Sequence, residues 1–429
     1  MSSVAIGLLA LFVLAAIGVP IAFAMALAGF IGFSMVVSVH GAMAMVGQLT
    51  FDTALNYNLS VLPLFILMGN FITRARLSED LYSAAYTVVG HYRGGLALSA
   101  LMACAGFSAV CGSSLATAAT MSRVTMPSMR QFGYKDSLAT GAVAAGGTLG
   151  ILIPPSIALV LYGIMTNNDI GKLFIAGVLP GLLGLALYCL TVTVVTTLDR
   201  QAGPPGERTS WAQRLVQLKR VWGVTLLFVI VIGGIYTGIF TSTEAAGIGA
   251  AFAGVFAILR GGLRLGEIYE VLVDTARMSA MIFAIMIGAM IFANFVNVAG
   301  VLQALDAAVR AMNLTPMGVM IGILVIYVVL GMLMESMSML LLTVPIFYPL
   351  AMSYGFDPIW FGIIVVVVIE IGLITPPVGM NVFTLRATLP NVPTSTIFRG
   401  VAPFIVADIV RLALLVAIPW ITLVLPSHL

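Results

Sequence analysis

The sequence has few charged residues, which make up only 8% of its 429 positions. Hydrophobic residues make up 61%, and the mean hydropathy is +1.14. Soluble domains carry about 25% charged residues, so this composition excludes a soluble protein and indicates a chain embedded in a membrane. At about 20 apolar residues per span, the length accommodates roughly ten spans and leaves no soluble domain over.

Cysteine and histidine are also scarce, with three of each. They form no CxxC motif and no Cys/His cluster, so no transition-metal site is expected. Cys104, Cys111 and Cys189 lie in apolar runs and are interpreted as small buried hydrophobes. The net charge of +3 is not gathered into a basic stripe, so no nucleic-acid partner is expected. The spans lack HExxH and His/Asp/Ser patterns and any cofactor fingerprint, which argues against an enzyme.

Long apolar runs are what the sequence has in abundance. The first, within a predicted scaffold region 1–53, lacks a basic leader and a cleavage site, so we expect the mature protein to keep it. Gly18 and Pro20 predict a kink in it, or two shorter helices. The predicted apolar segments are 4–39, 54–72, 94–121, 138–165, 173–198, 222–240, 245–259, 279–298, 317–352, 359–385 and 401–425.

Two stretches, 74–92 and 265–278, alternate charged residues with Leu and Tyr at helical spacing. This pattern is typical of helices that lie in the plane of the membrane interface. We expect each to form an interfacial arm.

The positions of the basic residues predict the topology, because cytoplasmic loops are enriched in Lys and Arg. We treat 94–134 and 316–356 as re-entrant hairpins and the loop 199–221 as cytoplasmic. Of the 19 basic residues, 16 then fall inside, Lys172 and Arg310 fall outside, and Arg411 lies within a span. The inside residues are those at 74, 76, 93, 123, 130, 135, 200, 208, 214, 219, 220, 260, 264, 277, 386 and 399. The first hairpin then opens to the cytoplasm and the second to the outside.

The sequence also matches itself at a shift of 222 residues. The shift pairs Pro154 with Pro376 and Pro155 with Pro377, and it pairs a Gly, a Pro and a Ser elsewhere in the hairpins. We interpret 54–198 and 222–425 as two repeats, each with a hairpin and a Pro-Pro-broken helix, at 137–165 and 358–385. The predicted topology inverts one relative to the other. Inverted repeats with broken helices are typical of secondary transporters.

Backbone freed at a Pro-Pro break is tolerated at membrane depth only where it lines a cavity or an ion site. Carbonyl and hydroxyl oxygens suit Na⁺, and half-helix N-termini suit a carboxylate. The predicted cation ligands are Gly112, Ser113, Ser114, Thr148, Pro154, Glu335, Ser336, Thr375, Pro377 and Gly379. The predicted substrate ligands are Ser114, Thr117, Pro155, Ser156, Ser338 and Asn381.

Acids within spans are costly and are functional candidates by default. Glu335 at the second hairpin break and Glu370 just before the second Pro-Pro both map to the predicted site. Asp408 and Arg411 are three residues apart, and we expect them to neutralise each other in a structural role. Glu244 opens a span, where the helix dipole favours an acid.

The motifs GSSLATAA at 112–119, GGTLGILIPPS at 146–156 and TPPVGMNVF at 375–383 resemble the large membrane subunit of tripartite ATP-independent periplasmic (TRAP) transporters of the dicarboxylate type. The resemblance implies an elevator-type, Na⁺-driven importer in the bacterial inner membrane. It also implies a small four-helix membrane subunit and a periplasmic binding protein that delivers the substrate. Because no further spans follow residue 425, we expect the small subunit to be a separate polypeptide.

Two other transport mechanisms are weighed against this one. A stand-alone sodium/dicarboxylate symporter would share the architecture and need no binding protein. A passive channel fits less well, because hairpins that meet broken helices suit an occluded site. The substrate is expected to be a small organic acid, with C4-dicarboxylates and sialic acid as examples.

Overall fold

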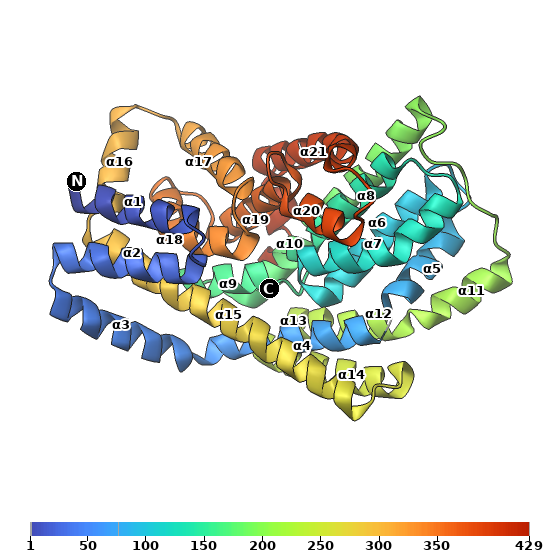
Figure 1. The fold of residues 1–429 in the computed structure, drawn as a ribbon, viewed down its shortest axis with the longest axis horizontal. Coiled ribbons are helices and arrows are strands. Elements are labelled where there is room, and N and C mark those ends of the chain that lie inside the picture. Colours follow the sequence, from blue (N-terminus) through green and yellow to red (C-terminus); the bar gives the residue numbers. More distant parts are fainter. Residues whose placement is uncertain (1, 76, 429) are drawn as a thin grey trace.

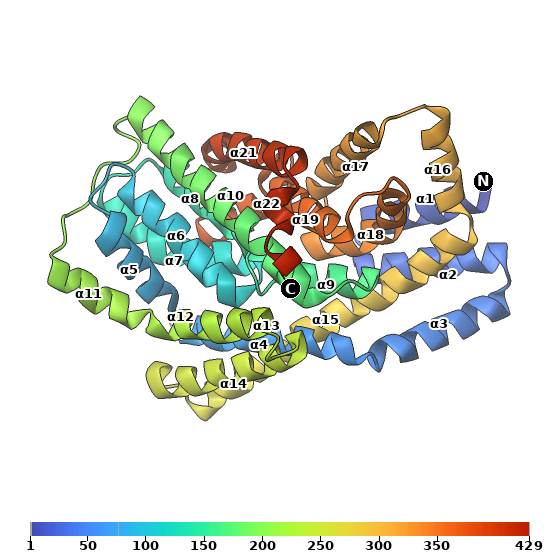
Figure 2. The ribbon, with the colours of Figure 1, turned by 180° about the vertical axis from the view of Figure 1, so that it is seen from behind.

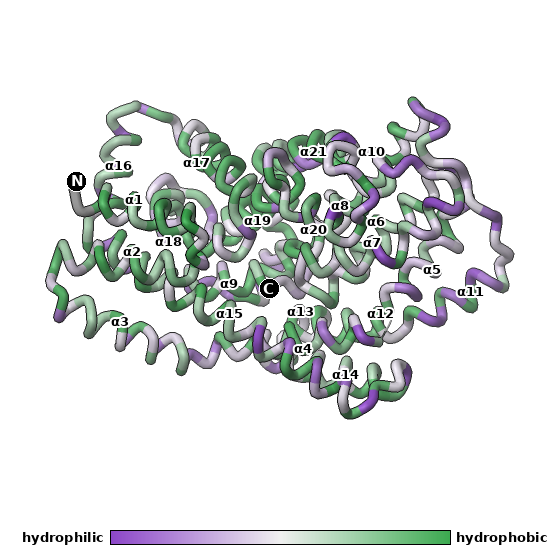
Figure 3. The backbone as a smooth tube through the Cα atoms, viewed as in Figure 1, coloured by the Kyte–Doolittle hydropathy of each residue, from purple (hydrophilic) through white to green (hydrophobic). Residues whose placement is uncertain are grey.

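The computed structural model describes residues 2–75 and 77–428, and over these residues it is built from helices and loops (Figures 1 and 2). Arg76, one of the basic residues predicted to be cytoplasmic, lies outside the described residues. Apolar residues dominate nearly every helix, and polar residues gather at the connections and at the α5–α11 end (Figure 3). This distribution is that of a multi-pass membrane protein.

The helices, in chain order, are α1 (Ser2–Ala16), α2 (Ile21–Val36), α3 (Val39–Ala54), α4 (Val61–Arg74), α5 (Leu77–Val89), α6 (Gly95–Cys111), α7 (Ser114–Gln131), α8 (Asp136–Thr148), α9 (Ile157–Thr166), α10 (Ile170–Leu198), α11 (Trp211–Arg220), α12 (Trp222–Phe228), α13 (Gly234–Tyr236), α14 (Ser242–Gly261), α15 (Leu265–Val298), α16 (Val301–Ala311), α17 (Pro316–Gly331), α18 (Ser336–Ser353), α19 (Pro358–Ile374), α20 (Met380–Thr388), α21 (Thr394–Ala417) and α22 (Trp420–Leu423). Short helical turns lie at Tyr57–Ser60, Leu149–Ile151, Val229–Gly233 and Pro426–His428.

Within the described residues, five helices are long and apolar enough to cross a membrane alone, and two bent pairs raise this number to seven. Six further apolar helices are shorter, with 10–17 residues each. The apolar runs of the sequence predict roughly ten spans. Several of those runs are divided into shorter helices, so run length overestimates the number of single-helix crossings.

Glycine and proline divide these runs. The first run separates into α1 and α2 at Gly18, which has a φ of +86°, and Pro20. The hairpin helices meet at 112–113 and at 332–335, and the Pro-Pro pairs separate α8 from α9 and α19 from α20. Glycine adopts positive φ without a steric penalty, and proline cannot donate a helical hydrogen bond, so these residues account for the breaks at Gly18 and Pro20, at Gly112 and at the Pro-Pro pairs. The break at 332–335 contains neither residue.

One predicted boundary is absent from the structure. We expected a separate helix at 265–278, but this stretch continues without interruption into the 34-residue α15. No glycine or proline lies between residues 267 and 287, so nothing in the sequence stops the helix there. In contrast, the predicted arm 74–92 contains the separate helix α5.

Helix bounds recur along the chain at the shift of 222 residues. Adding 222 to the bounds of α2, α5 and α10 gives 243–258, 299–311 and 392–420, close to α14, α16 and α21. The same shift takes α1 to 224–238, which overlaps α12 and α13. The recurrence thus extends to the N-terminus, which differs from the boundary expected at residue 54. The shift also makes α16, and not residues 265–278, the counterpart of α5.

The packing follows the same correspondence. Helix α7 contacts α20, and their counterparts α18 and α9 contact each other. Helix α21 contacts α8, and their counterparts α10 and α19 do so as well. The second helix of each hairpin therefore packs on the helix that follows the Pro-Pro pair of the other half, which brings both breaks to the middle of the molecule (Figure 1).

Candidate functional site

The tip of the first hairpin packs on the first Pro-Pro break. Gly112 ends α6 with a φ of +64°, and a β-carbon there would lie 3.1 Å from the carbonyl oxygen of Pro155. A β-carbon on Gly150 would lie 3.0 Å from the Ser113 carbonyl oxygen. Ser113 then caps α7 by accepting a hydrogen bond from the Ala116 N–H. Small residues at these positions permit the tight approach of the two backbones.

Asn381 connects this tip to the second half of the chain. Its side-chain oxygen accepts a 2.9 Å hydrogen bond from Ser114 Oγ, and its Nδ2 donates to the Ala144 carbonyl at 3.0 Å. Both Ser114 and Asn381 are buried, at 3% and 0% exposure. Two residues predicted from opposite repeats as substrate ligands are therefore in direct contact, and they join α7, α8 and α20.

Replacing Asn381 with alanine is expected to reduce transport about tenfold, since it removes two hydrogen bonds of about 1 kcal/mol or less each at the helix junction. Initial uptake rates in proteoliposomes measure this. Asn391→Ala, at an exposed position shortly after α20, serves as the control and should transport normally. Equal rates in both variants would remove Asn381 from the site.

The tip of the second hairpin carries Glu335. Its carboxylate accepts hydrogen bonds from the backbone N–H groups of Met337 and Ser338, at 2.9 and 3.1 Å, and from Ser336 Oγ at 2.8 Å. It therefore caps α18 as an N-cap acid. Behind the tip, a β-carbon on Gly372 would lie 2.6 Å from Gly331 Cα, so the hairpin and α19 are in backbone contact.

The predicted hydroxyl ligands differ in whether their oxygen atoms are free to bind a cation or a substrate. Thr117 and Thr375 donate their hydrogens to the carbonyls of Ser113 and Ile371, at 2.8 and 2.5 Å, which leaves each oxygen free to accept or to bind a cation. The Thr148 oxygen lies 3.1 Å from the Tyr188 hydroxyl.

Ser156 donates to the Ile151 carbonyl and accepts from the Leu159 N–H at 3.2 Å, so its oxygen also has a partner already. The two Pro-Pro peptide bonds, at 154–155 and 376–377, are both cis. Gly379, with a φ of +61°, begins α20 directly after the second break. The structure thus keeps Pro154, Pro377 and Gly379 in the breaks, as the sequence suggests.

A buried ionic cluster lies beside the breaks. Arg411 pairs with Glu370 and, at 2.9 Å, with Asp408, and all three side chains are fully buried. Tyr188 donates a 2.7 Å hydrogen bond to Asp408 and continues the network to Thr148. The expected pairing of Asp408 with Arg411 is present.

Glu370, which the sequence analysis names as a site candidate from its place just before the second Pro-Pro pair, belongs to this cluster. Sequence spacing could not reveal the pairing, because 41 residues separate Glu370 from Arg411. Positions 148 and 370 are equivalent under the 222-residue shift. The cluster therefore links the last turns of the two helices that end at the breaks.

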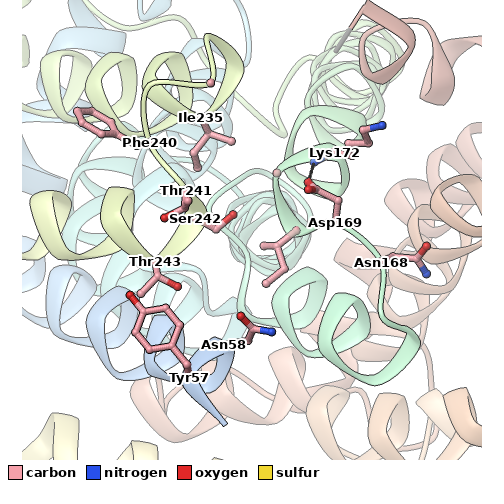
Figure 4. A pocket seen from close by; sticks show the side chains of 13 residues that line it. Tyr57, Asn58, Asn168, Asp169, Lys172, Ile235, Phe240, Thr241, Ser242 and Thr243 are labelled. Carbon is pink, nitrogen blue, oxygen red and sulfur yellow. Dashed lines mark hydrogen bonds between the residues drawn. The ribbon is translucent and has the colours of Figure 1, made fainter.

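A surface cavity lies away from the breaks. It has a volume of about 600 Å³ and lies between the turn at Tyr57–Ser60, the start of α10 and the connection from α13 to α14 (Figure 4). Polar groups line it, including Asn58, Asn168 and Thr241, and Asp169 caps α10 by accepting from the Lys172 N–H at 2.8 Å. The predicted site residues do not line this cavity.

Metal ligands do not cluster in the part of the chain that the structure describes. Over residues 2–75 and 77–428, no three His, Cys, Asp or Glu side chains lie together in a metal-binding arrangement. Glu335 has only hydroxyl and backbone partners, and Glu370 and Asp408 pair with an arginine. The acids of the spans are therefore used as caps and ion pairs.

Curated relatives align with nearly all of the chain. It is 38% identical to the C4-dicarboxylate TRAP transporter large permease protein DctM of Pseudomonas aeruginosa, over 88% of each chain. It is 33% identical to the ectoine TRAP transporter large permease protein TeaC of Halomonas elongata, over 95% of each. It is also 33% identical to the sialic acid TRAP transporter large permease protein SiaM of Vibrio cholerae, over 87% of each.

Solved structures share the fold at much lower identity. The Alcanivorax borkumensis YdaH transporter aligns with a TM-score of 0.65 and 16% identity, over 90% of this chain and 91% of the other. MtrF of Neisseria gonorrhoeae aligns with a TM-score of 0.55 and 14% identity, over 87% and 83%. The first is a transporter, and the second belongs to a class of antimetabolite efflux pumps.

The family called Tripartite ATP-independent periplasmic transporter, DctM component, matches residues 8–421. Members of this family are transporter subunits and not enzymes. The chain therefore belongs to the DctM family, the large permease subunits of TRAP transporters.

Proposed function

We propose that the chain couples the inward movement of Na⁺ to the import of a small organic carboxylate across the bacterial inner membrane. The contact between Ser114 and Asn381 supports this most directly, because it joins the first hairpin tip to the second Pro-Pro break. Polar groups buried at the junction of two halves are the arrangement expected of a secondary-transport site. Membership of the family supports the same function.

The coupling ion is proposed to bind where hydroxyl oxygens face freed carbonyls. Thr375, a predicted cation ligand, keeps an oxygen available beside the second break, and Thr117, a predicted substrate ligand, keeps one at the first hairpin tip. Carbonyl and hydroxyl oxygens form a neutral cage of hard ligands, which suits Na⁺. One cation site per half would then flank the substrate.

The transport movement is proposed to be of the elevator type, in two inverted repeats. Helices α7 and α18 pack on α20 and α9, so both hairpins and both broken helices form one packed unit. Helices α2, α4, α14 and α15 contact one another in equivalent pairs, α2 with α15 and α14 with α4. The first unit would move against the second, which forms the scaffold.

The substrate class rests on the relatives. The names of several specify C4-dicarboxylate, sialic acid and ectoine, which carry a carboxylate group, and one specifies isethionate, which carries a sulfonate. The half-helix N-terminus at Ser114 presents backbone N–H groups suited to such a group. We therefore propose a carboxylate-bearing substrate and assign no single compound.

A periplasmic binding protein and a small four-helix membrane subunit complete the proposed transporter. A related isethionate permease, DctMQ of Oleidesulfovibrio alaskensis, is 33% identical over 98% of this chain, which covers 64% of that protein. By the predicted topology, the binding protein would meet the face that carries Lys172 and the cavity of Figure 4.

Uptake of a labelled acid should require all three components and an inward Na⁺ gradient. The measurement uses this chain and the small subunit in liposomes, with the loaded binding protein outside and K⁺ replacing Na⁺ as the control. Omitting the binding protein should abolish uptake. If the chain alone takes up the free acid, the function is that of a stand-alone sodium/dicarboxylate symporter, the alternative that shares this architecture.

A further inference from the structure

Helix α11 exposes a row of apolar side chains along one face. Trp211, Leu215 and Leu218, at helical spacing along one face, are 77%, 59% and 46% exposed. Gln217 is only partly exposed and its amide oxygen is buried, whereas the Arg214 guanidinium lies over the Trp211 ring, 5.0 Å from its centroid. A helix that exposes its apolar face to water would be unfavourable, so this face requires an apolar medium.

The inward face of α11 is fixed against α5. Gln213 and Gln217 line a cavity of about 350 Å³ together with Tyr82, Tyr86 and Thr87 of α5. The preceding loop is held by hydrogen bonds from Thr209 Oγ1 to the Thr87 carbonyl, at 2.7 Å, and from the Glu207 N–H to the Tyr86 hydroxyl, at 3.1 Å. The orientation of the helix is therefore set by the protein, and its apolar face is turned outward.

Helix α11 lies at the edge of the molecule and is bent relative to the helix that follows it. The chain bends by 49° between α11 and α12, and both views place α11 at the periphery of the molecule (Figures 1 and 2). Trp211 is the first residue of α11, and Trp222, which is 54% exposed, is the first residue of α12. Tryptophan is enriched where a protein crosses the boundary between headgroups and acyl chains.

The charge around α11 indicates which kind of lipid surface it would bind. Residues 206–220 contain four basic residues, Arg208, Arg214, Lys219 and Arg220, and one acid, Glu207, which gives a net charge of +3. Among the described residues, none of these four basic side chains forms an ion pair. Basic residues beside an exposed apolar helix face are complementary to anionic headgroups.

We propose that α11 is an anionic-lipid binding element, which seats its Trp211–Leu215–Leu218 face at the acyl boundary and its four basic residues among acidic headgroups. It links the two halves of the chain and packs against α5, to which the preceding loop is hydrogen-bonded. The Arg220 carbonyl also accepts from Arg260 Nη1 at 2.6 Å, and Arg260 pairs with Asp80 of α5 at 2.9 Å. The lipid surface would thus hold α5 and α14 at a constant depth.

Fluorescence quenching tests the proposal in the full chain. Trp222, Trp360 and Trp420 are changed to phenylalanine so that Trp211 is the only tryptophan, and the protein is placed in phosphatidylcholine nanodiscs that contain brominated phosphatidylglycerol or brominated phosphatidylcholine at equal mole fraction. Trp211 should be quenched by both lipids and more strongly by the anionic one. Each basic residue near an acidic surface contributes about a fivefold change in partitioning, so changing all four to glutamine should equalise the two lipids.

The control keeps Trp420 as the only tryptophan, since it is 67% exposed near the other end of the chain. Its quenching should not respond to the four glutamine substitutions. A monodisperse elution profile establishes that each variant is folded. No quenching of Trp211 by either lipid, or equal quenching by both with the basic residues intact, would overturn the proposal. Loss of quenching when the small membrane subunit is added would overturn it too, because a protein would then cover this face.

Discussion

Replacing Arg411 with methionine is expected to prevent the chain from folding stably. The substitution leaves Glu370 and Asp408 fully buried without a cationic partner. Removing one member of a buried ion pair costs about 3–5 kcal/mol, which is a large part of the total stability of a protein. The thermal transition of the detergent-purified protein, followed by light scattering and tryptophan fluorescence, measures the effect.

Two further variants separate charge from packing at this position. Arg399→Met removes an exposed arginine from the same helix and should leave the transition unchanged. Glu370→Gln keeps a side chain of the same length and leaves Arg411 paired with Asp408, so this variant should fold. An Arg411→Met protein that melts with the wild type would show that the cluster does not stabilise the fold.

Replacing Gly400 with alanine is expected to separate α21 from α8. A β-carbon there would lie 1.9 Å from the Ser137 carbonyl oxygen, and one on Gly141 would lie 2.2 Å from the Gly400 carbonyl oxygen. Both obstacles are backbone atoms, which cannot rotate away. Overpacking in a core costs about 1–3 kcal/mol, and α8 leads directly into the first break, so the thermal transition and uptake should both fall.

Gly322→Ala is a control that is expected to change the stability in the opposite direction. Gly322 also lies within a helix, but a β-carbon there would have no heavy atom within 4 Å. Alanine is preferred over glycine in a helix by about 1 kcal/mol, so this variant should be as stable as the wild type or more so. Similar losses in both variants would mean that the tight contact between α8 and α21 is not important for stability.

The local breaks of the fold could be predicted from sequence, because their causes are local. Gly112 and the two Pro-Pro pairs each interrupt a helix through their own backbone chemistry, and Gly379, with its positive φ, precedes the start of α20. The continuity of α15 was not predicted, because alternating charges near residues 265–278 resemble those of an interfacial helix. Charge alternation describes the surroundings of a helix and does not end it.

The long-range contacts of the site could not be predicted from the sequence. Ser114 and Asn381 were each proposed as ligands, but their contact joins residues 267 positions apart. Asp408 and Arg411 could be paired from their i, i+3 spacing, whereas the addition of Glu370 and Tyr188 depends on how α10, α19 and α21 pack. The outward apolar face of α11 likewise needs the position of α5 to be interpreted.

Binding of Na⁺ to the purified chain tests the central claim most directly. A ligand that binds only the folded state stabilises it by about 2.7 kcal/mol at a hundred times its dissociation constant. The thermal transition should therefore rise with NaCl and not with equal KCl, and Thr375→Val, which removes the available oxygen beside the second break, should weaken the response. Equal responses to the two salts in the wild type would contradict a Na⁺ site at the breaks.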